Sequence, residues 1–387
     1  MIGDRVGVRI LALEPFYGGS HRRFLDRWQA LSRHHITLWT LPARFWKWRM
    51  RHAGLEFAER FEQAETSESW DLIFCSDMLN LAEFRGLAPA AAALPTVLYF
   101  HENQLTYPVR KEEERDRHFA FSNLLSARAA DAVWWNSGFH RDDFAQAARD
   151  WLRRLPDFQP LDSVDGILAK SSVLPQGIDL PPPRRASREP GPLRILWAAR
   201  WEFDKNPEAF FAAVGRLKEL GHPFRLSVLG ERYRRSPEIF DQAQRDLDGH
   251  IDHWGYLDGR DAYLEALGRA DVVVSTADHE FFGVAVAEAV AAGCRPLLPD
   301  RLAYPELIQD LEPATDYLYK SDDELHDRLL SLAVAADRGE PLWPAGARGP
   351  GPEAGHRAMA RYAWPKIVQD LDGACERVAV AFAALAR

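Results

Sequence analysis

The sequence predicts an α/β protein with two doubly wound domains. Short apolar runs alternate with segments of helical period, which is typical of parallel sheets covered by helices on both faces. The 387 residues are too many for one ordinary core. The stretch 181–192, rich in Pro and Gly, interrupts the alternation, and the pattern then restarts. We therefore expect a first domain over 1–180, a linker over 181–192, a second domain over 193–355, and a C-terminal helix over 356–387 that packs back on the first domain.

Both halves of the chain contain buried-type strands. In the first half we expect strands at 8–13, 36–41, 71–75, 96–100, 132–136 and 172–174. In the second half we expect them at 194–198, 225–229, 251–254, 272–275 and 296–298. Ligands of such sheets bind at the carboxyl ends of the strands. The chemistry should therefore lie in the loops that follow them, facing the cleft between the domains.

Composition restricts the partners. A formal net charge of −9 argues against a protein that coats nucleic acid nonspecifically, although a local basic patch could dock a structured RNA. Three widely separated cysteines and the lack of a His cluster at ligand spacing predict neither a metal site nor a disulfide framework. The sequence shows no signal peptide and no apolar run of about 20 residues. We expect a cytoplasmic protein that spans no membrane.

The segment DHEFFGVAVAE at 278–288 places two carboxylates eight residues apart across the start of a helix. At about 1.5 Å and 100° per residue, those of Glu280 and Glu288 lie roughly 12 Å apart. This separation suits a ligand with a sugar at one end and a ribose at the other, because both present paired hydroxyls. Gly283 leaves room for a phosphate at the turn. The alternative is ordinary helix decoration, since Glu is common in first turns.

The loop 14–21, EPFYGGSH, follows the first expected strand. Gly18 and Gly19 would let backbone amides approach a ligand, and Ser20 could cap the next helix. The spacing is neither G-x-G-x-x-G nor a Walker motif, so it specifies neither NAD nor ATP. A generic tight turn is the alternative.

The loop 199–207 follows the first strand of the second domain. Arg200 and Lys205 could both approach one diphosphate and stabilise the negative charge that builds as a nucleoside diphosphate departs. They would then replace a metal ion. The alternative is a pair of solvated cations beside a helix capped by Asp204 or Asn206.

The loop 99–108 concentrates hydrogen-bonding side chains past another strand, among them His101, Asn103 and Gln104. Such groups are costly unless something pairs with them, so we expect contact with a sugar or an acceptor. Asn136 and Ser137 follow the next strand and line the same rim. For Ser137, a plain helix cap is an equal alternative.

The segment 43–52 interleaves four cations with three aromatics, a composition suited to phosphate contacts and base stacking. The alternative is a partly buried amphipathic helix whose arginines reach solvent along their stems. A second RNA contact could lie at 232–235. The RNA-contacting candidates are Arg44, Trp46, Lys47, Trp48, Arg49 and Arg51.

With these motifs in place, the chain resembles known enzymes. The paired domains, Arg200 with Lys205, and Glu280-x7-Glu288 resemble retaining glycosyltransferases of family 4, which have the GT-B fold of two Rossmann-like domains facing across a cleft. More narrowly, four strings resemble the tRNA-queuosine alpha-mannosyltransferase family: EPFYGGSH at 14–21, FHENQLTYP at 100–108, WNS at 135–137 and LPQGID at 174–179. The resemblance runs from about Ile10 to Leu307. The donor motifs are shared by the whole superfamily, whereas the two long strings of the first domain are specific.

The resemblance implies transfer of mannose from GDP-mannose to the cyclopentenediol of queuosine in the anticodon of aspartate tRNA, with no cofactor and no DNA partner. It implies that the acceptor hydroxyl attacks from the face that the diphosphate leaves, so that catalysis rests on positioning and charge stabilisation. In the donor site it assigns Arg200 and Lys205 to the diphosphate and Glu288 to the ribose. It assigns the transferred sugar to His101, near the reacting carbon, and to Glu280 with the amides of Phe281, Phe282 and Gly283. Gly18 and Gly19 would let the first domain close over the donor. The expected acceptor side comprises Ser20, His21, Asn103, Gln104, Asn136 and Ser137.

Two other functions fit parts of this pattern. A family 4 enzyme acting on a saccharide or lipid-linked acceptor would share every donor motif, and the Trp46 and Trp48 segment could then face a membrane. A non-catalytic RNA-binding module is disfavoured because both carboxylates and both cations are present.

Overall fold

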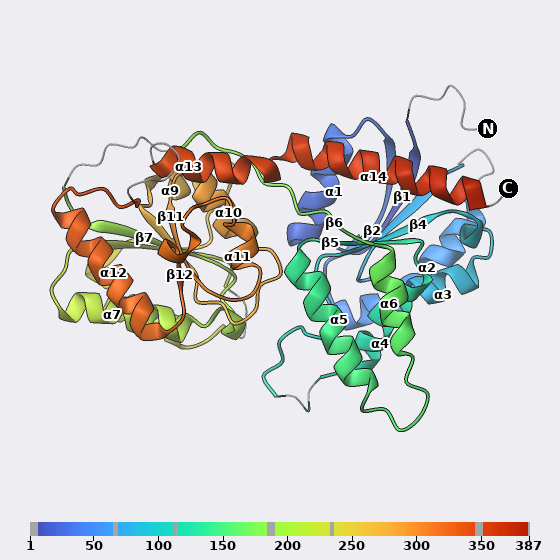
Figure 1. Ribbon diagram of the computed structural model, residues 1–387, viewed down its shortest axis with the longest axis horizontal. Helices are drawn as coiled ribbons and strands as arrows, with labels where there is room; N and C mark the ends of the chain where they lie inside the picture. Colours follow the sequence, from blue (N-terminus) through green and yellow to red (C-terminus); the bar gives the residue numbers. More distant parts are fainter. Residues whose placement is uncertain are drawn as a thin grey trace. The chain divides into compact units, whose positions relative to one another are not determined.

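The computed structural model describes residues 7–64, 69–111, 113, 115–183, 190–232, 236–344 and 351–385. The chain divides into two compact units (Figure 1). Unit 1 comprises 1–177 and 364–387, and unit 2 comprises 178–363. Each unit contains a six-stranded parallel sheet, so the predicted α/β class is confirmed.

The sheet of unit 1 has the strand order β2-β1-β3-β4-β5-β6. Its strands are β1 (Arg9–Tyr17), β2 (His35–Pro42), β3 (Leu72–Ser76), β4 (Thr96–Phe100), β5 (Ala132–Trp135) and β6 (Ser171–Val173). Its helices are α1 (Gly19–Leu31), α2 (Trp46–Gln63), α3 (Leu81–Leu87), α4 (Arg117–Ala129), α5 (Gly138–Leu152), α6 (Leu161–Ala169) and α14 (Trp364–Leu385). Strand β1 lies next to the edge strand β2 and pairs with both β2 and β3, so Ala12 lies between Leu38 and Phe74.

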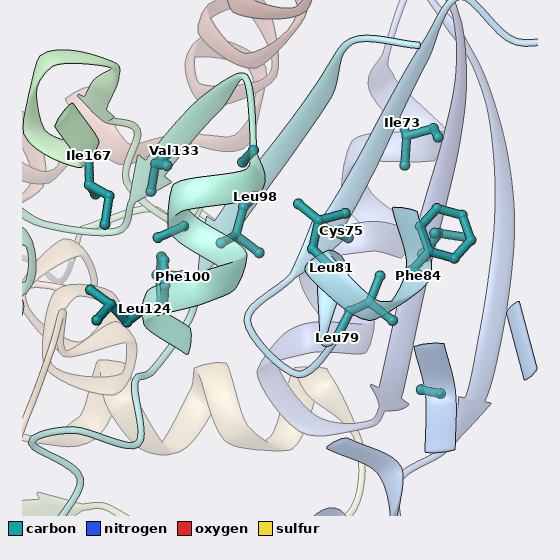
Figure 2. Close-up of a cluster of buried hydrophobic side chains, with 14 of the residues drawn as sticks. Ile73, Cys75, Leu79, Leu81, Phe84, Leu98, Phe100, Leu124, Val133 and Ile167 are labelled. Atoms are coloured by element: carbon teal, nitrogen blue, oxygen red, sulfur yellow. The ribbon is translucent and has the colours of Figure 1, made fainter. Parts of the chain in front are cut away.

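Successive side chains of a strand point to opposite faces, and both faces of this sheet are apolar. On one face, Ile73, Cys75 and Leu98 pack against α3 and α4, as Figure 2 shows. On the other face, Phe74 and Tyr99 pack with residues of α1 and α14. The near-continuous apolar runs in the sequence therefore reflect burial on both faces.

The sheet of unit 2 has the order β12-β11-β10-β7-β8-β9. Its strands are β7 (Leu193–Ala198), β8 (Phe224–Leu229), β9 (Ile251–Gly255), β10 (Val272–Val274), β11 (Arg295–Pro299) and β12 (Leu318–Tyr319). Its α-helices are α7 (Pro207–Glu219), α8 (Ile239–Asp246), α9 (Arg260–Arg269), α10 (Val284–Ala291), α11 (Tyr304–Leu307), α12 (Asp322–Asp337) and α13 (Gly351–Met359). Helices cover both faces here too, with α9, α10, α11 and α13 on one and α7, α8 and α12 on the other. Part of the expected linker, 184–189, lies outside the described residues.

The expected single helix over 356–387 is wrong at its beginning. Residues 356–359 end α13, which belongs to unit 2, and the helix of unit 1 starts only at Trp364. Pro365 explains the break, because proline fits the first turn of a helix but cannot continue one. Within unit 1, the buried Asp372 of α14 accepts hydrogen bonds from Trp28 Nε1 (2.9 Å), Ser32 Oγ (2.7 Å) and the backbone N–H of Arg33 (2.9 Å). These bonds fix α14 to the end of α1.

No helix within the described parts of the chain has the length and apolarity needed to cross a membrane. The three cysteines are buried, and no disulfide joins any of them.

Candidate functional site

In unit 1, the loop after β1 folds His21 back onto Glu14. The buried Glu14 carboxylate accepts from Phe16 N at 2.8 Å and Ser76 Oγ at 3.1 Å, and its second oxygen lies 3.1 Å from His21 Nδ1. Burial opposes the charge on His21, but the adjacent Glu14 outweighs it and raises the pKa of His21 to about 9. The sequence analysis expected His21 to contact the acceptor substrate. In the structure His21 instead forms a buried ion pair with Glu14.

The same loop corrects the expected role of Ser20. The N-cap of α1 is Gly18, with an extended backbone, and Ser20 is an exposed residue inside the helix. A Cβ at Gly18 would lie 2.4 Å from the Ala43 Cβ, so only glycine fits there. Gly19 needs its freedom for a different reason, a φ of +52°.

His101 lies directly beyond β4 and stacks on His21, with ring centroids 4.0 Å apart. Its Nδ1 is 2.8 Å from the Gln176 amide nitrogen, which donates, so the neutral ring carries its proton on Nε2. Burial, followed by the charges of His21 and His140, lowers the pKa of His101 well below its usual range. His101 is therefore buried and neutral, and its Nε2–H can donate one hydrogen bond.

Glu14, His21 and His101 each offer a ligand atom, and the three atoms lie within 4.8 Å of one another. A metal ion binds in the plane of an imidazole, yet these two rings are tilted by only 32° and stacked. Glu14 already pairs with His21, and Gln176 occupies His101 Nδ1. The cluster fits a hydrogen-bonded network better than a coordination sphere, and the metal-free site remains a prediction.

The other polar residues of this rim mainly shape the loops. Asn103 Oδ1 accepts from Leu105 N and Thr106 N, so the Asn103 side chain holds its own turn rather than reaching for an acceptor. Asn136 donates to the His101 carbonyl at 2.9 Å. Ser137 Oγ accepts from His140 N, which is the helix-cap alternative.

Gln104 is also buried. Its N–H donates to Asn123 Oδ1 at 2.7 Å, and its side-chain nitrogen donates to Glu102 Oε1 at 3.2 Å. Gln104 therefore supports the His101 loop from behind.

Sequence reasoning missed Asp77, which follows β3. It is fully buried, and its Oδ1 accepts from the N–H of His101 at 2.8 Å. Burial raises the pKa of Asp77 to about 8. Asp77 could have been found in the sequence, because it lies directly after a buried strand, and the same position identified the other candidate loops.

In unit 2, Lys205 and Glu280 come together. Lys205 is buried, and its Nζ donates to the His279 carbonyl at 2.6 Å and lies 3.2 Å from Asp204 and 3.5 Å from Glu280. Burial favours the neutral acid at Glu280, but Lys205 and His279 outweigh it, so the pKa of Glu280 is lowered. Its Oε1 accepts from Phe282 N at 3.4 Å. An ionised carboxylate therefore stands at the start of α10, as the sequence predicted.

The turn before α10 depends on Gly283, which has a φ of +93° and forms the N-cap. Phe281 and Phe282 are buried beside it, so their side chains anchor the loop while its amides precede the helix. Arg200 is more exposed than Lys205, with 43% of its side chain accessible and its guanidinium 3.4 Å from Glu202. A diphosphate can reach Arg200 from solvent.

Glu288 is buried on α10 and bound by a residue that the sequence did not single out. Arg260, the first residue of α9, donates to both Glu288 oxygens, at 3.0 and 2.5 Å, and its Nε donates to Asp179 at 2.9 Å. Each carboxylate oxygen has two lone-pair sites, so Glu288 can still accept from ribose hydroxyls.

The basic and aromatic segment forms the first turns of α2. Trp48 is 61% and Trp46 37% exposed, and the exposed cations are Arg44, Lys47 and Arg51. The expectation for Arg49 is wrong, because it is buried. Its Nε donates to the Pro42 carbonyl at 3.1 Å, and a terminal nitrogen lies 2.9 Å from His52 Nε2.

The side chains of this surface pack on the buried Phe119 of α4. The Trp46 ring lies 5.3 Å from that of Phe119, and the Arg51 guanidinium lies 5.2 Å above the Phe119 ring. We call Arg44, Trp46, Lys47, Trp48 and Arg51 the α2 patch. Of the second expected RNA contact, 233–235 lie outside the described residues, and Arg232 pairs with Asp241 at 2.8 Å.

Known proteins match both units. Residues 9–178 match the family described as tRNA-queuosine alpha-mannosyltransferase N-terminal, and 183–334 match glycosyl transferases group 1. The tRNA-queuosine alpha-mannosyltransferase of Drosophila melanogaster is 37% identical over 334 residues, covering 84% of this chain and 86% of the relative. A GDP-mannose-dependent phosphatidylinositol dimannoside mannosyltransferase of Mycobacterium tuberculosis is 26% identical, covering 62% of this chain and 59% of the relative.

Solved structures share the fold at low identity. The sucrose-phosphate synthase of Thermosynechococcus elongatus has a TM-score of 0.68 at 16% identity, over 96% of this chain and 100% of that one. Anabaena HepE, solved in complex with UDP, has a TM-score of 0.63 at 14% identity, over 95% and 100%. These neighbours confirm the GT-B fold. With the two family matches and the Drosophila relative, they show that the chain is a glycosyltransferase and belongs to the tRNA-queuosine alpha-mannosyltransferase family.

Proposed function

We propose that this protein transfers mannose from GDP-mannose to queuosine in the anticodon of aspartate tRNA, in the cytoplasm and without a metal ion. One observation carries the proposal above all: nearly the whole of unit 1 matches the N-terminal part of the tRNA-queuosine alpha-mannosyltransferases. The donor groups of unit 2 are common to transferases with many acceptors, so acceptor choice must depend on unit 1.

The donor chemistry is supported by the charges of unit 2. Lys205 and Arg200 follow β7 and would neutralise the negative charge that builds on the diphosphate as it leaves. Without a metal ion, stabilising this charge is the largest single requirement of the transfer. The ionised Glu280 would accept hydrogen bonds from the sugar, and Glu288 from the ribose. In unit 1, His101 Nε2 would donate to a sugar hydroxyl. The protein groups then act by positioning and by fixed charge rather than as a nucleophile.

The α2 patch supports an RNA acceptor. A surface that combines cations with accessible indole rings suits phosphates and unstacked bases, as in single-stranded anticodon loops. This patch stands out in a chain with a formal charge of −9. A local cationic surface would orient the tRNA without attracting nucleic acid over the rest of the molecule.

The test is mannosyl transfer by the purified protein. GDP-mannose is supplied with aspartate tRNA carrying queuosine, and with the same tRNA carrying guanosine at that position. Mass spectrometry of the digested nucleosides should show one added hexose on queuosine and none on guanosine. Transfer to a lipid-linked or saccharide acceptor, with none to the queuosine tRNA, would overturn the proposal. UDP-glucose and GDP-glucose in parallel identify the base and the sugar.

A further inference from the structure

Asp77 Oδ2 and His101 Nε2 are among the buried side-chain atoms of unit 1 that have no hydrogen-bond partner within the described residues. Leaving such an atom unpaired costs about 1–3 kcal/mol. Folded proteins rarely retain that cost unless a ligand or an ordered water supplies the partner. Their residues are hydrogen-bonded to each other, because His101 N donates to Asp77 Oδ1 at 2.8 Å.

The backbone around Asp77 is fixed on both sides. Its N–H donates to the Tyr99 carbonyl at 3.0 Å, and its carbonyl accepts from Asn123 Nδ2 at 2.9 Å. Oδ1 also lies 3.4 Å from the N–H of Glu102, so this oxygen serves the loop after β4. One oxygen of the carboxyl group is therefore committed to the fold, and the other is left over in a preset orientation.

The two unpaired atoms have opposite polarity. Gln176 donates to His101 Nδ1, so Nε2 carries the hydrogen and is a donor. Asp77 Oδ2 is an acceptor in the ionised form of the group. Burial raises the pKa of Asp77 to about 8, so the ionised form is the minor one near pH 7 while Oδ2 is unpaired, and a hydroxyl that donates to Oδ2 favours it. A hydroxyl group needs one donor and one acceptor, which matches this pair.

We propose that Asp77 is a substrate-contacting residue, whose Oδ2 accepts a hydrogen bond from a substrate hydroxyl beside His101. The hydroxyl belongs to a polyol, either the transferred sugar or the diol of the acceptor nucleoside. The inference rests on the proposed function and adds a residue to its site. The competing role for Asp77 is purely structural, with Oδ1 holding the His101 loop and Oδ2 contributing nothing.

Asp77→Asn separates these roles. Asparagine keeps a carbonyl oxygen for the N–H groups of His101 and Glu102, but it replaces the free oxygen with an amide nitrogen that cannot accept. We expect kcat/KM for transfer to fall by about 10- to 100-fold, the loss of one hydrogen bond to a charged group. Wild-type kcat/KM in a folded Asp77→Asn protein would overturn the proposal.

Donor hydrolysis without acceptor identifies the source of the hydroxyl. If Asp77 contacts the sugar, hydrolysis falls together with transfer, and KM for the nucleotide-sugar rises. If it contacts the acceptor diol, hydrolysis stays at the wild-type rate while transfer falls. Wild-type transfer is measured first. If the wild-type protein hydrolyses the donor but does not mannosylate the tRNA, the proposed function has failed. Donor hydrolysis by Asp77→Asn then tests the Asp77 proposal alone, and a wild-type hydrolysis rate in this variant would contradict it.

Ser126→Ala is the matched control. Ser126 is fully buried in the same unit, accepts from Leu81 N at 3.0 Å and donates to the Leu79 carbonyl at 3.2 Å. Its loss should lower the melting temperature and leave kcat/KM unchanged. Equal losses of kcat/KM in the two variants would assign the Asp77 effect to instability and overturn the proposal.

A second experiment applies if Asp77→Asn does not fold. Deoxy analogues of the sugar and of the acceptor diol are tested one hydroxyl at a time on the wild-type protein. At least one analogue should lose about 10-fold or more in kcat/KM, because the missing hydroxyl leaves buried polar atoms unpaired. If no analogue does, the proposal is wrong.

Discussion

Arg260 donates to both carboxylate oxygens of Glu288, although 28 residues separate them in the chain. Glu288 is buried, so Arg260 supplies a countercharge that offsets the burial of its carboxylate. Arg260 also bonds Asp179, at the start of unit 2. The proposed ribose contact of Glu288 thus depends on a residue outside every motif identified in the sequence.

Replacing Arg260 with Leu should destabilise unit 2 by about 3–5 kcal/mol, because it leaves the buried Glu288 carboxylate without a countercharge. Donor KM should rise as well. Arg260→Lys should recover part of the stability, since it keeps the charge but loses the bidentate geometry. Melting temperatures and donor KM measure both effects.

Arg225→Ala is the control for that experiment. Arg225 pairs with Asp252 at 2.6 Å on the surface of the same unit, where an ion pair contributes about 0–1 kcal/mol. If Arg260→Leu were no less stable than Arg225→Ala, Glu288 would not depend on Arg260.

How far the sequence predicted this structure varies with the feature. The sheets were readable because apolar runs recur at strand length, and the missed strand β12 has only two residues, Leu318–Tyr319. The local Glu280 motif was readable for the same reason, since a strand, a glycine turn and a helix follow one another. The pairs His21 with Glu14 and Arg260 with Glu288 were not, because the turns that join them are set by tertiary packing.

Arg49 is different, because the signal was present in the sequence. It precedes Ala53 by four residues and Phe57 by eight, and both are buried, so helical periodicity places Arg49 on the core face of α2. The composition of the segment alone does not show which face of the helix each residue occupies, and so it led to the wrong expectation for Arg49.

The two cations after β7 should differ in what their loss does. Arg200→Ala and Lys205→Ala should each lower turnover by about 10²- to 10³-fold, as removal of one charge stabiliser does. Lys205→Ala should also lower the melting temperature, because Asp204 and Glu280 lose their buried countercharge. Lys218→Ala, an exposed cation of the same unit, is the control and should change neither quantity. Transfer within a few-fold of wild type in both site variants would remove them from the diphosphate site.

Transfer should persist in excess EDTA. In the proposed mechanism Arg200 and Lys205 would supply the positive charge for the diphosphate. Glu14 already pairs with His21, and Gln176 occupies His101 Nδ1. The measurement is the transfer rate before and after chelation, with divalent ions added back. Loss of activity that a divalent ion restores would contradict the metal-free mechanism, and metal content of a His21→Asn protein would then show whether this cluster binds the ion.

The Glu14–His21 pair should stabilise unit 1 most below neutral pH. The pKa of His21 is raised from 6.5 to about 9, so its contribution is complete below pH 6.5 and is lost as the pH rises through about 9. The melting-temperature difference between wild type and His21→Asn should therefore be large at about pH 6 and small near pH 10. A difference that grows with pH would show that His21 is buried in the neutral form.

The α2 patch yields a prediction that separates RNA binding from folding. Lys47→Ala should weaken tRNA binding and flatten its salt dependence by about 0.9 in log–log slope for each phosphate that the protein no longer neutralises, while donor binding stays unchanged. Trp48→Ala should lose about 1–3 kcal/mol of stacking without loss of stability, because its ring is largely exposed. Arg49→Ala is the control variant. It removes hydrogen bonds to Pro42 and His52, so it should lower stability while leaving the salt dependence of tRNA binding unchanged.

Wild-type tRNA affinity in both Lys47→Ala and Trp48→Ala would exclude the α2 patch as the RNA-binding surface. Retained tRNA binding with impaired transfer to a lipid-linked acceptor would instead mark it as a membrane-facing surface.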